Sequence, residues 1–132
     1  MPKEIDTALQ QATQGLLYQS ETDAPFEIIH WPNGAASLDP KTVLKLSGHK
    51  PKDPVETMSV DEFFKPLTDV QAWFGKEEKA AAQKYRQLRE VIQQQLNNPE
   101  VFKVGKIQVD VFIVGRSPQG HWAGLKTKAV ET

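Results

Sequence analysis

The pattern of apolar and polar positions is most regular between Thr68 and Pro99, where it predicts a long helix. Apolar or half-apolar side chains recur there in steps of three and four, which places them on one helix face: Ala81, Tyr85, Leu88, Val91, Ile92 and Leu96. Glu77 and Glu78 suit the positive end of the helix dipole, and Pro99 cannot continue the helix. We therefore expect a helix with one buried face that stops at this proline.

The segment after the helix changes to a period of two, which is typical of strands. Its apolar residues fall first on one face, at Ile107, Val109, Val111 and Ile113, and then also on the other, at Phe112 and Val114. Residues 101–104 form a shorter apolar run, and residues 115–120 have the composition of a hairpin connection. The chain then returns through residues 122–130, so we expect three antiparallel strands covered by the long helix.

Shorter elements are expected before the long helix. The pattern predicts a helix at residues 3–14, a polar turn at 19–25, a strand at 26–31, a helix from Asp39-Pro40 to Gly48 and an edge strand at 55–58. Ser59 and Glu62 have the spacing of a capping box before a short helix that Pro66 should halt. Thr68 and Gln71 have the spacing of a second box.

The element order favours one α+β domain, residues 1–132, with a central antiparallel sheet and helices on both sides. Hydrophobic content of 39% and charged content of 25% are ordinary for a globular protein. There is no long apolar run and no recognisable signal peptide, and cysteine is absent, so a cytoplasmic location is expected. A net charge of −1 gives no global electrostatic footprint for nucleic acid.

Catalytic chemistry has little support in the sequence. Ser47 and Lys50 spell S-x-x-K, but the later partner motifs of that hydrolase class are missing. The three histidines, His30, His49 and His121, fall in separate elements without a second ligand at metal spacing, which favours structural or solvated histidines. A weak enzyme built on His49 or His121 remains an alternative.

A basic strand face and several aromatic residues each have two interpretations. Lys126 and Lys128 share one face of the last strand, where a solvated face is favoured over a nucleic-acid surface. Trp73 and Phe74 lie at a junction between a loop and a helix, and Trp31 ends a strand. Each aromatic side chain either plugs the edge of a small core or serves as a protein-binding anchor.

Several short motifs, taken in order, resemble one known family. They read GLLYQSE at 15–21, PFE at 25–27, DEFF at 61–64, QAWF at 71–74, DVF at 110–112 and TKAVET at 127–132. Together they resemble the nuclease A inhibitor family of cyanobacteria, from the first helix to the last residue. The resemblance implies a three-layer α/β/α sandwich with a mainly antiparallel central sheet, similar to the plant pathogenesis-related protein 1 fold.

The resemblance also implies a function without catalysis. Such a protein would bind and block a sugar-nonspecific DNA/RNA endonuclease of the ββα-metal type, as a monomer on one nuclease. It would have no cofactor of its own and no direct contact with nucleic acid or membrane. Glu21 would engage the region of the nuclease's catalytic arginine, Trp73 would pack at the interface, and the Thr132 hydroxyl would reach the catalytic magnesium.

These implied roles agree with elementary chemistry. Mg²⁺ accepts hard oxygen ligands, and a carboxylate can occupy the place of a substrate phosphate. The stretch from Ala72 to Lys76 is less acidic than its counterpart in the family. A non-catalytic module of the same fold that binds another protein or a small ligand is therefore the alternative.

Overall fold

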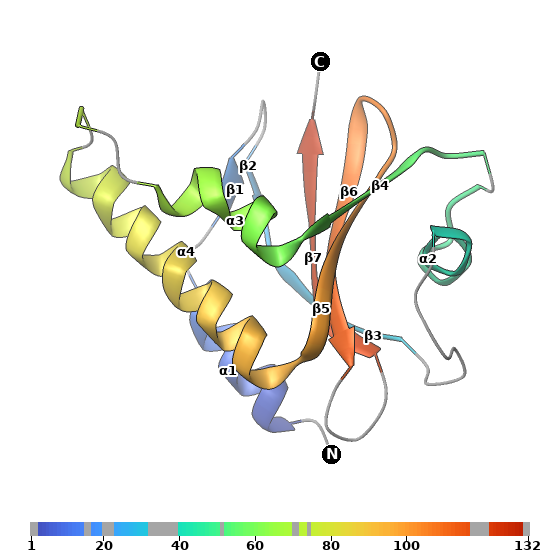
Figure 1. The fold of residues 1–132 in the computed structure, drawn as a ribbon, viewed down its shortest axis with the longest axis horizontal. Helices are drawn as coiled ribbons and strands as arrows, with labels where there is room; N and C mark the ends of the chain where they lie inside the picture. Colours follow the sequence, from blue (N-terminus) through green and yellow to red (C-terminus); the bar gives the residue numbers. More distant parts are fainter. Residues whose placement is uncertain are drawn as a thin grey trace.

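The structure, a computed structural model, describes residues 3–14, 17–19, 23–31, 40–50, 52–69, 72–73, 75–116 and 122–130. Helices and strands alternate irregularly along the chain (Figure 1). Their bounds are α1 Lys3–Thr13, β1 Leu17–Gln19, β2 Asp23–Pro25, β3 Glu27–Trp31, α2 Pro40–Ser47, β4 Val55–Ser59, α3 Val60–Thr68, α4 Lys76–Gln95, β5 Asn97–Val104, β6 Gln108–Arg116 and β7 Trp122–Val130.

A five-stranded sheet forms the centre of the molecule, in the order β3-β7-β6-β5-β4. Each of these neighbouring pairs is antiparallel, and β4 lies at an edge as the sequence predicts. The α+β class with a central antiparallel sheet is therefore confirmed. The three-layer sandwich and the likeness to the pathogenesis-related protein 1 fold remain predictions.

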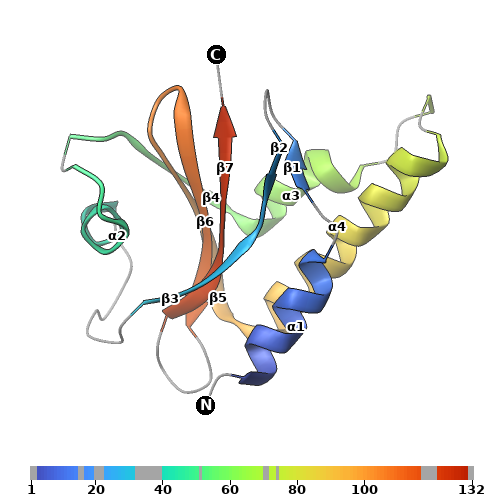
Figure 2. The same cartoon turned by 180° about the vertical axis from the view of Figure 1, so that it is seen from behind.

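The two faces of the sheet contact different helices, as the period of two in β6 predicts. Val111 and Ile113 pack into a core with side chains of α1, α3 and α4, whereas Phe112 and Val114 pack into a second core with α2. Figures 1 and 2 show α2 on one side of the sheet and the other three helices on the opposite side. The prediction that Ile107 belongs to the apolar face of this strand is wrong, because Ile107 precedes β6 and is 60% exposed.

Helix α4 has the predicted buried face, but it begins differently. Tyr85, Leu88 and Ile92 are buried. Thr68 opens no second capping box, because it is the last residue of α3 and is buried there; Gln71 lies outside the described residues. The backbone N–H of Gly75 instead donates to Glu78 Oε2 at 3.0 Å, which closes the start of α4. In the part of the chain that the structure describes, no helix has the length and apolarity needed to cross a membrane.

The predicted helix stop at Pro99 is four residues late. Helix α4 ends at Gln95, and residues 97–99 already belong to β5. Asn98 has a φ of 49° at this transition, and the pairing of β5 with β6 shifts there. Asparagine adopts the left-handed conformation more readily than most residues, so an irregular strand start replaces a helix cap.

Helix α3 begins as predicted and extends further. Ser59 Oγ accepts from the backbone N–H of Glu62 at 3.0 Å, which confirms Ser59 as the N-cap of α3, and the Ser59 hydroxyl donates to Glu62 Oε1 at 3.2 Å. Pro66 does not halt the helix, which runs to Thr68 and closes with a bond from Asp69 N to Lys65 O at 3.0 Å. A proline this close to the helix end removes one donor in the last turns, and the buried Phe63 and Phe64 hold the segment in place.

The predicted polar turn at residues 19–25 is too long, because Asp23–Pro25 form strand β2, while residues 20–22 lie outside the described residues. Strands β1 and β2 are antiparallel, with Leu17 opposite Pro25 and Gln19 opposite Asp23. Thr127 Oγ1 donates to the carbonyl of Pro25 at 3.0 Å, so this hairpin packs against β7. Strands of three residues carry too little alternation to be recognised in a sequence.

Candidate functional site

Several segments that are distant in sequence lie toward one end of the molecule. The chain leaves the sheet there at Val130, the end of β7. Figures 1 and 2 show that the β5–β6 connection, the ends where β1 stops and β2 begins, and the α3–α4 connection lie toward the same end. We call this region the β7 end. It contrasts with the opposite end, where α1 starts and α4 stops.

Strand register places the β1–β2 hairpin beside the end of β7. Glu27 pairs with Lys126 in the β3–β7 ladder, and Thr127 Oγ1 bonds the carbonyl of Pro25. The chain traced back from Glu27 to Asp23 therefore follows β7 toward Val130. Glu21 and Thr132 themselves lie outside the described residues. The structure brings together the segments that flank them in sequence.

The structure decides differently between the two interpretations for Trp73 and for Trp31. Trp73, in the α3–α4 connection, is 74% exposed, so the interpretation as a core plug is wrong for this residue. Trp31 is 8% exposed, and its ring centroid lies 5.4 Å from that of Phe112. Trp31 is therefore a core residue rather than an interface anchor. Phe74 lies outside the described residues.

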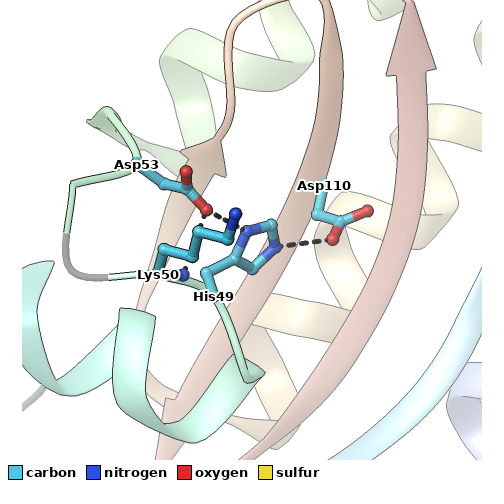
Figure 3. Close-up of polar contacts among 4 residues, drawn as sticks. All are labelled: His49, Lys50, Asp53 and Asp110. Carbon is cyan, nitrogen blue, oxygen red and sulfur yellow. Dashed lines mark hydrogen bonds and ion pairs between the residues drawn. The ribbon is translucent and has the colours of Figure 1, made fainter.

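A cluster of polar side chains joins the loop after α2 to the sheet. The sequence analysis did not predict it. His49 Nδ1 lies 2.9 Å from Asp53 Oδ2, and His49 Nε2 lies 2.7 Å from Asp110 Oδ2 (Figure 3). The backbone N–H of Lys50 donates to the same Asp53 oxygen at 3.2 Å. Asp53 follows His49 by four residues, but Asp110 is 61 positions away, so no local signal indicates the cluster.

The cluster fits a structural tie better than a catalytic site. A carboxylate accepts hydrogen bonds, so each ring nitrogen of His49 bonds its partner only while it carries a hydrogen. Both ring nitrogens thus face carboxylates of the same protein, which suits a side chain that ties the loop after α2 to β6. His121 lies outside the described residues. Among the residues that are described, no group of three or more histidine or carboxylate side chains is arranged to hold a metal ion.

Replacing Asp53 with asparagine is expected to lower the melting temperature at neutral pH. The hydrogen bond to His49 and, less strongly, the Lys50 backbone N–H lower the pKa of Asp53 from its ordinary value of 3.8. The charged carboxylate therefore favours the folded state above that value, and this stabilisation is lost as the pH falls through the lowered pKa. Melting curves should show a difference between the two proteins at neutral pH that disappears in strong acid.

The control for this experiment is Asp69→Asn, which removes an exposed carboxyl after α3. It should leave the melting curve unchanged at every pH. Asp110 and Lys50 also lie close to His49, Lys128 lies opposite Asp110 in the β6–β7 ladder, and Lys126 lies over the Phe112 ring that His49 contacts. Both variants keep all of these groups. Equal melting temperatures of wild type and Asp53→Asn at neutral pH would contradict the structural role.

Two further surface features are the lysine-bearing face of β7 and a hollow between α1 and β3. Lys126 Nζ lies 5.8 Å from the ring centroid of Phe112, and Lys128 is exposed opposite Asp110. This arrangement fits the predicted solvated strand face. A shallow hollow of about 730 Å³ between α1 and β3 is lined by Gln10, Gln11, Thr13, Gln14, Phe26 and Ile28. The walls formed by the described residues carry amide, hydroxyl and apolar groups.

Comparison with models of known protein families gives a match over nearly the whole chain. The model of a family described as nuclease A inhibitor-like protein matches residues 3–132. No curated protein matches the sequence. The matched range runs from the first residue of α1 past the end of β7, so it covers both cores and the β7 end rather than one local motif.

Proposed function

The chain belongs to the nuclease A inhibitor-like protein family, and from this membership we propose that it blocks the active site of a sugar-nonspecific DNA/RNA endonuclease of the ββα-metal type. Membership indicates a nuclease inhibitor in general, with a nuclease as partner. The observation that carries the finer proposal is the β7 end. The segments flanking Glu21 and Thr132 meet there, and the exposed Trp73 belongs to the same end.

The proposed mechanism uses the last residues of the chain as a plug. The final pair of the β6–β7 ladder joins Gln108 and Val130. The sheet thus anchors the chain at Val130, and residues 131–132 would extend from there into the active-site cleft of the nuclease. There the Thr132 hydroxyl would replace a water ligand of the nuclease's Mg²⁺, a hard ion that prefers oxygen donors.

Glu21 has the complementary role in this proposal. Its carboxylate would take the place of a substrate phosphate near the nuclease's catalytic arginine, where a charge-assisted hydrogen bond is strong. The net charge of −1 suits such a local plug better than a strongly acidic mimic of DNA.

The remaining parts of the proposal follow from the same premise. The protein acts in the cytoplasm as a monomer that binds one nuclease, without a cofactor of its own and without direct contact with nucleic acid or membrane. We also propose that the fold is a three-layer sandwich like that of pathogenesis-related protein 1. The position of α2 opposite α1, α3 and α4 supports this assignment (Figure 2).

A DNA digestion assay tests the proposal directly. Purified protein is mixed with several ββα-metal nucleases, including one from the same organism, and digestion is followed over time. Inhibition should saturate at one inhibitor per nuclease. Undiminished digestion by all of these nucleases at micromolar protein would overturn the proposal.

The alternative, a non-catalytic binding module of the same fold, draws on one observation: the described walls of the hollow between α1 and β3 suit a small neutral ligand. The digestion assay separates the two functions, because a module for another ligand leaves the nucleases active.

Glu21→Gln is expected to weaken inhibition about tenfold, because it removes the charge from one strong hydrogen bond while keeping the side chain's shape. The inhibition constant is measured in the digestion assay. Glu90→Gln is the matched control, since Glu90 is exposed in the second half of α4, away from the β7 end. Equal inhibition by Glu21→Gln and wild type would remove Glu21 from the proposed site.

A further inference from the structure

The β5–β6 connection lies directly beside the end of β7. Gln108 pairs with Val130 as the last pair of the ladder, and Ile107 is the residue before Gln108. Both views show the tip of this connection next to the C-terminal end of β7 (Figures 1 and 2). Neighbouring strands are about 4.8 Å apart, so a partner that receives the residues after Val130 also faces this turn.

Ile107 is the large apolar side chain that this turn exposes. Its exposed fraction is 60%, although the sequence pattern places it on the same face as the buried Val109 and Val111. A single exposed isoleucine is ordinary on protein surfaces. This one differs by its place, because it borders the segment that carries the proposed plug.

The turn that presents Ile107 is tightly built. Gly105 has a φ of +118°, and a Cβ atom at this position would lie 2.3 Å from the carbonyl oxygen of Gln108. The N–H of Gly105 donates to the carbonyl of Pro54 at 3.0 Å, which ties the turn to the segment before β4. Asp110, three residues after Ile107, is tied to His49. A contact made from such a preorganised turn loses little conformational entropy on binding.

We propose that Ile107 is a further partner-binding residue, which packs against an apolar patch on the rim of the nuclease active site. This inference rests on the proposed function, since the nuclease is the partner that the neighbouring strand end engages. The isoleucine side chain excludes water beside the plug, as the contacts that surround the most important residues of an interface do. The proposal also assigns a role to the shape of the turn, which Gly105 fixes.

The test compares Ile107→Ala and Ile107→Asp with wild type in the digestion assay. We expect inhibition to weaken about fivefold for alanine and about 30-fold for aspartate, which places a charge against an apolar patch. Ile107→Val, which keeps most of the apolar surface, should inhibit almost as well as wild type. Melting temperatures should stay close to that of wild type, because the side chain is largely exposed.

Gln10→Asp is the matched control, because Gln10 is exposed on α1 at the opposite end and the change adds the same charge. Inhibition by wild type together with undiminished inhibition by Ile107→Asp would overturn this inference and leave the proposed function intact. Failure of wild type to inhibit would overturn both. Sedimentation of the protein without nuclease tests whether a second copy of the chain binds this turn instead. A dimer that Ile107→Asp dissociates without loss of inhibition would assign the turn to self-association and overturn the inference.

Discussion

Thr132→Val is expected to weaken inhibition about 30-fold or more. Valine keeps the shape of threonine and deletes the hydroxyl oxygen, so it leaves the nuclease's Mg²⁺ without the proposed ligand. The fold should not respond, because the last pair of the sheet is Gln108 with Val130. Inhibition constants and a melting curve measure the two effects separately.

Two comparisons isolate the hydroxyl and the position of Thr132. Thr132→Ser keeps the oxygen and should retain most of the inhibition. An affinity tag added after Thr132 should abolish inhibition by blocking entry into the cleft, whereas the same tag before α1 should be tolerated, since α1 starts at the opposite end (Figure 1). Full inhibition by the C-terminally tagged protein and by Thr132→Val would show that these residues are no plug.

A double-mutant cycle of Glu21→Gln with Thr132→Val tests whether both residues act in one cleft. The segments that flank them lie close together, where β1 ends and β2 begins beside the end of β7. We therefore expect the combined loss to differ from the sum of the single losses. Strict additivity would place the two residues in separate parts of the interface.

The sequence predicted the sheet and the long helix well because their patterns are long and regular. The alternation from Val109 to Val114 assigned side chains correctly to two cores. The spacing of Tyr85, Leu88 and Ile92 identified the buried face of α4. In each case many positions contribute to one period, so a single deviation such as Ile107 does not hide the element.

The ends of elements were predicted less well, because single residues decide them. Pro66 and Pro99 were both interpreted as helix stops, yet one lies inside α3 and the other inside β5. The cap of α4 is the pair Gly75 and Glu78, in which the backbone N–H of Gly75 donates to the Glu78 carboxylate, although glycine has no side chain that could accept in return. Tertiary packing of the buried faces outweighs these local preferences.

Contacts between distant segments had no sequence signal of their own. The bond of Thr127 to the β1–β2 hairpin spans 102 positions, and the bond of His49 to Asp110 spans 61. The candidate residues came instead from the family resemblance. The structure adds that the segments around Glu21 and Thr132 converge, and that Trp73 is exposed.

Trp73→Ala is the second change with a large expected effect, a loss of about 2 kcal/mol or more in binding, which corresponds to roughly 30-fold weaker inhibition. Trp73 is 74% exposed in the connection between α3 and α4, so its removal leaves no cavity in either core. The melting temperature should therefore change little. A binding titration with the nuclease and one melting curve measure both quantities.

Trp31→Ala is the matched control, because it makes the same substitution at a buried position. Trp31 is 8% exposed and packs against Phe112, so its loss should lower the free energy of unfolding by about 3 kcal/mol or more. The two tryptophans should thus show opposite patterns, with affinity lost at one and stability lost at the other. A large melting shift with unchanged affinity for Trp73→Ala would contradict its role as an anchor.

The position of Trp73 also predicts how its effect combines with that of Thr132. The α3–α4 connection lies at the β7 end but on the outer side of the helices, apart from β7 in both views (Figures 1 and 2). A nuclease that contacts both regions must cover much of this end, which fits the roughly 800 Å² per partner of a standard interface. Residues at separate points of one interface contribute nearly additively. The double variant of Trp73→Ala and Thr132→Val should therefore lose the sum of the two binding free energies, and strong coupling between them would show that the two residues act together.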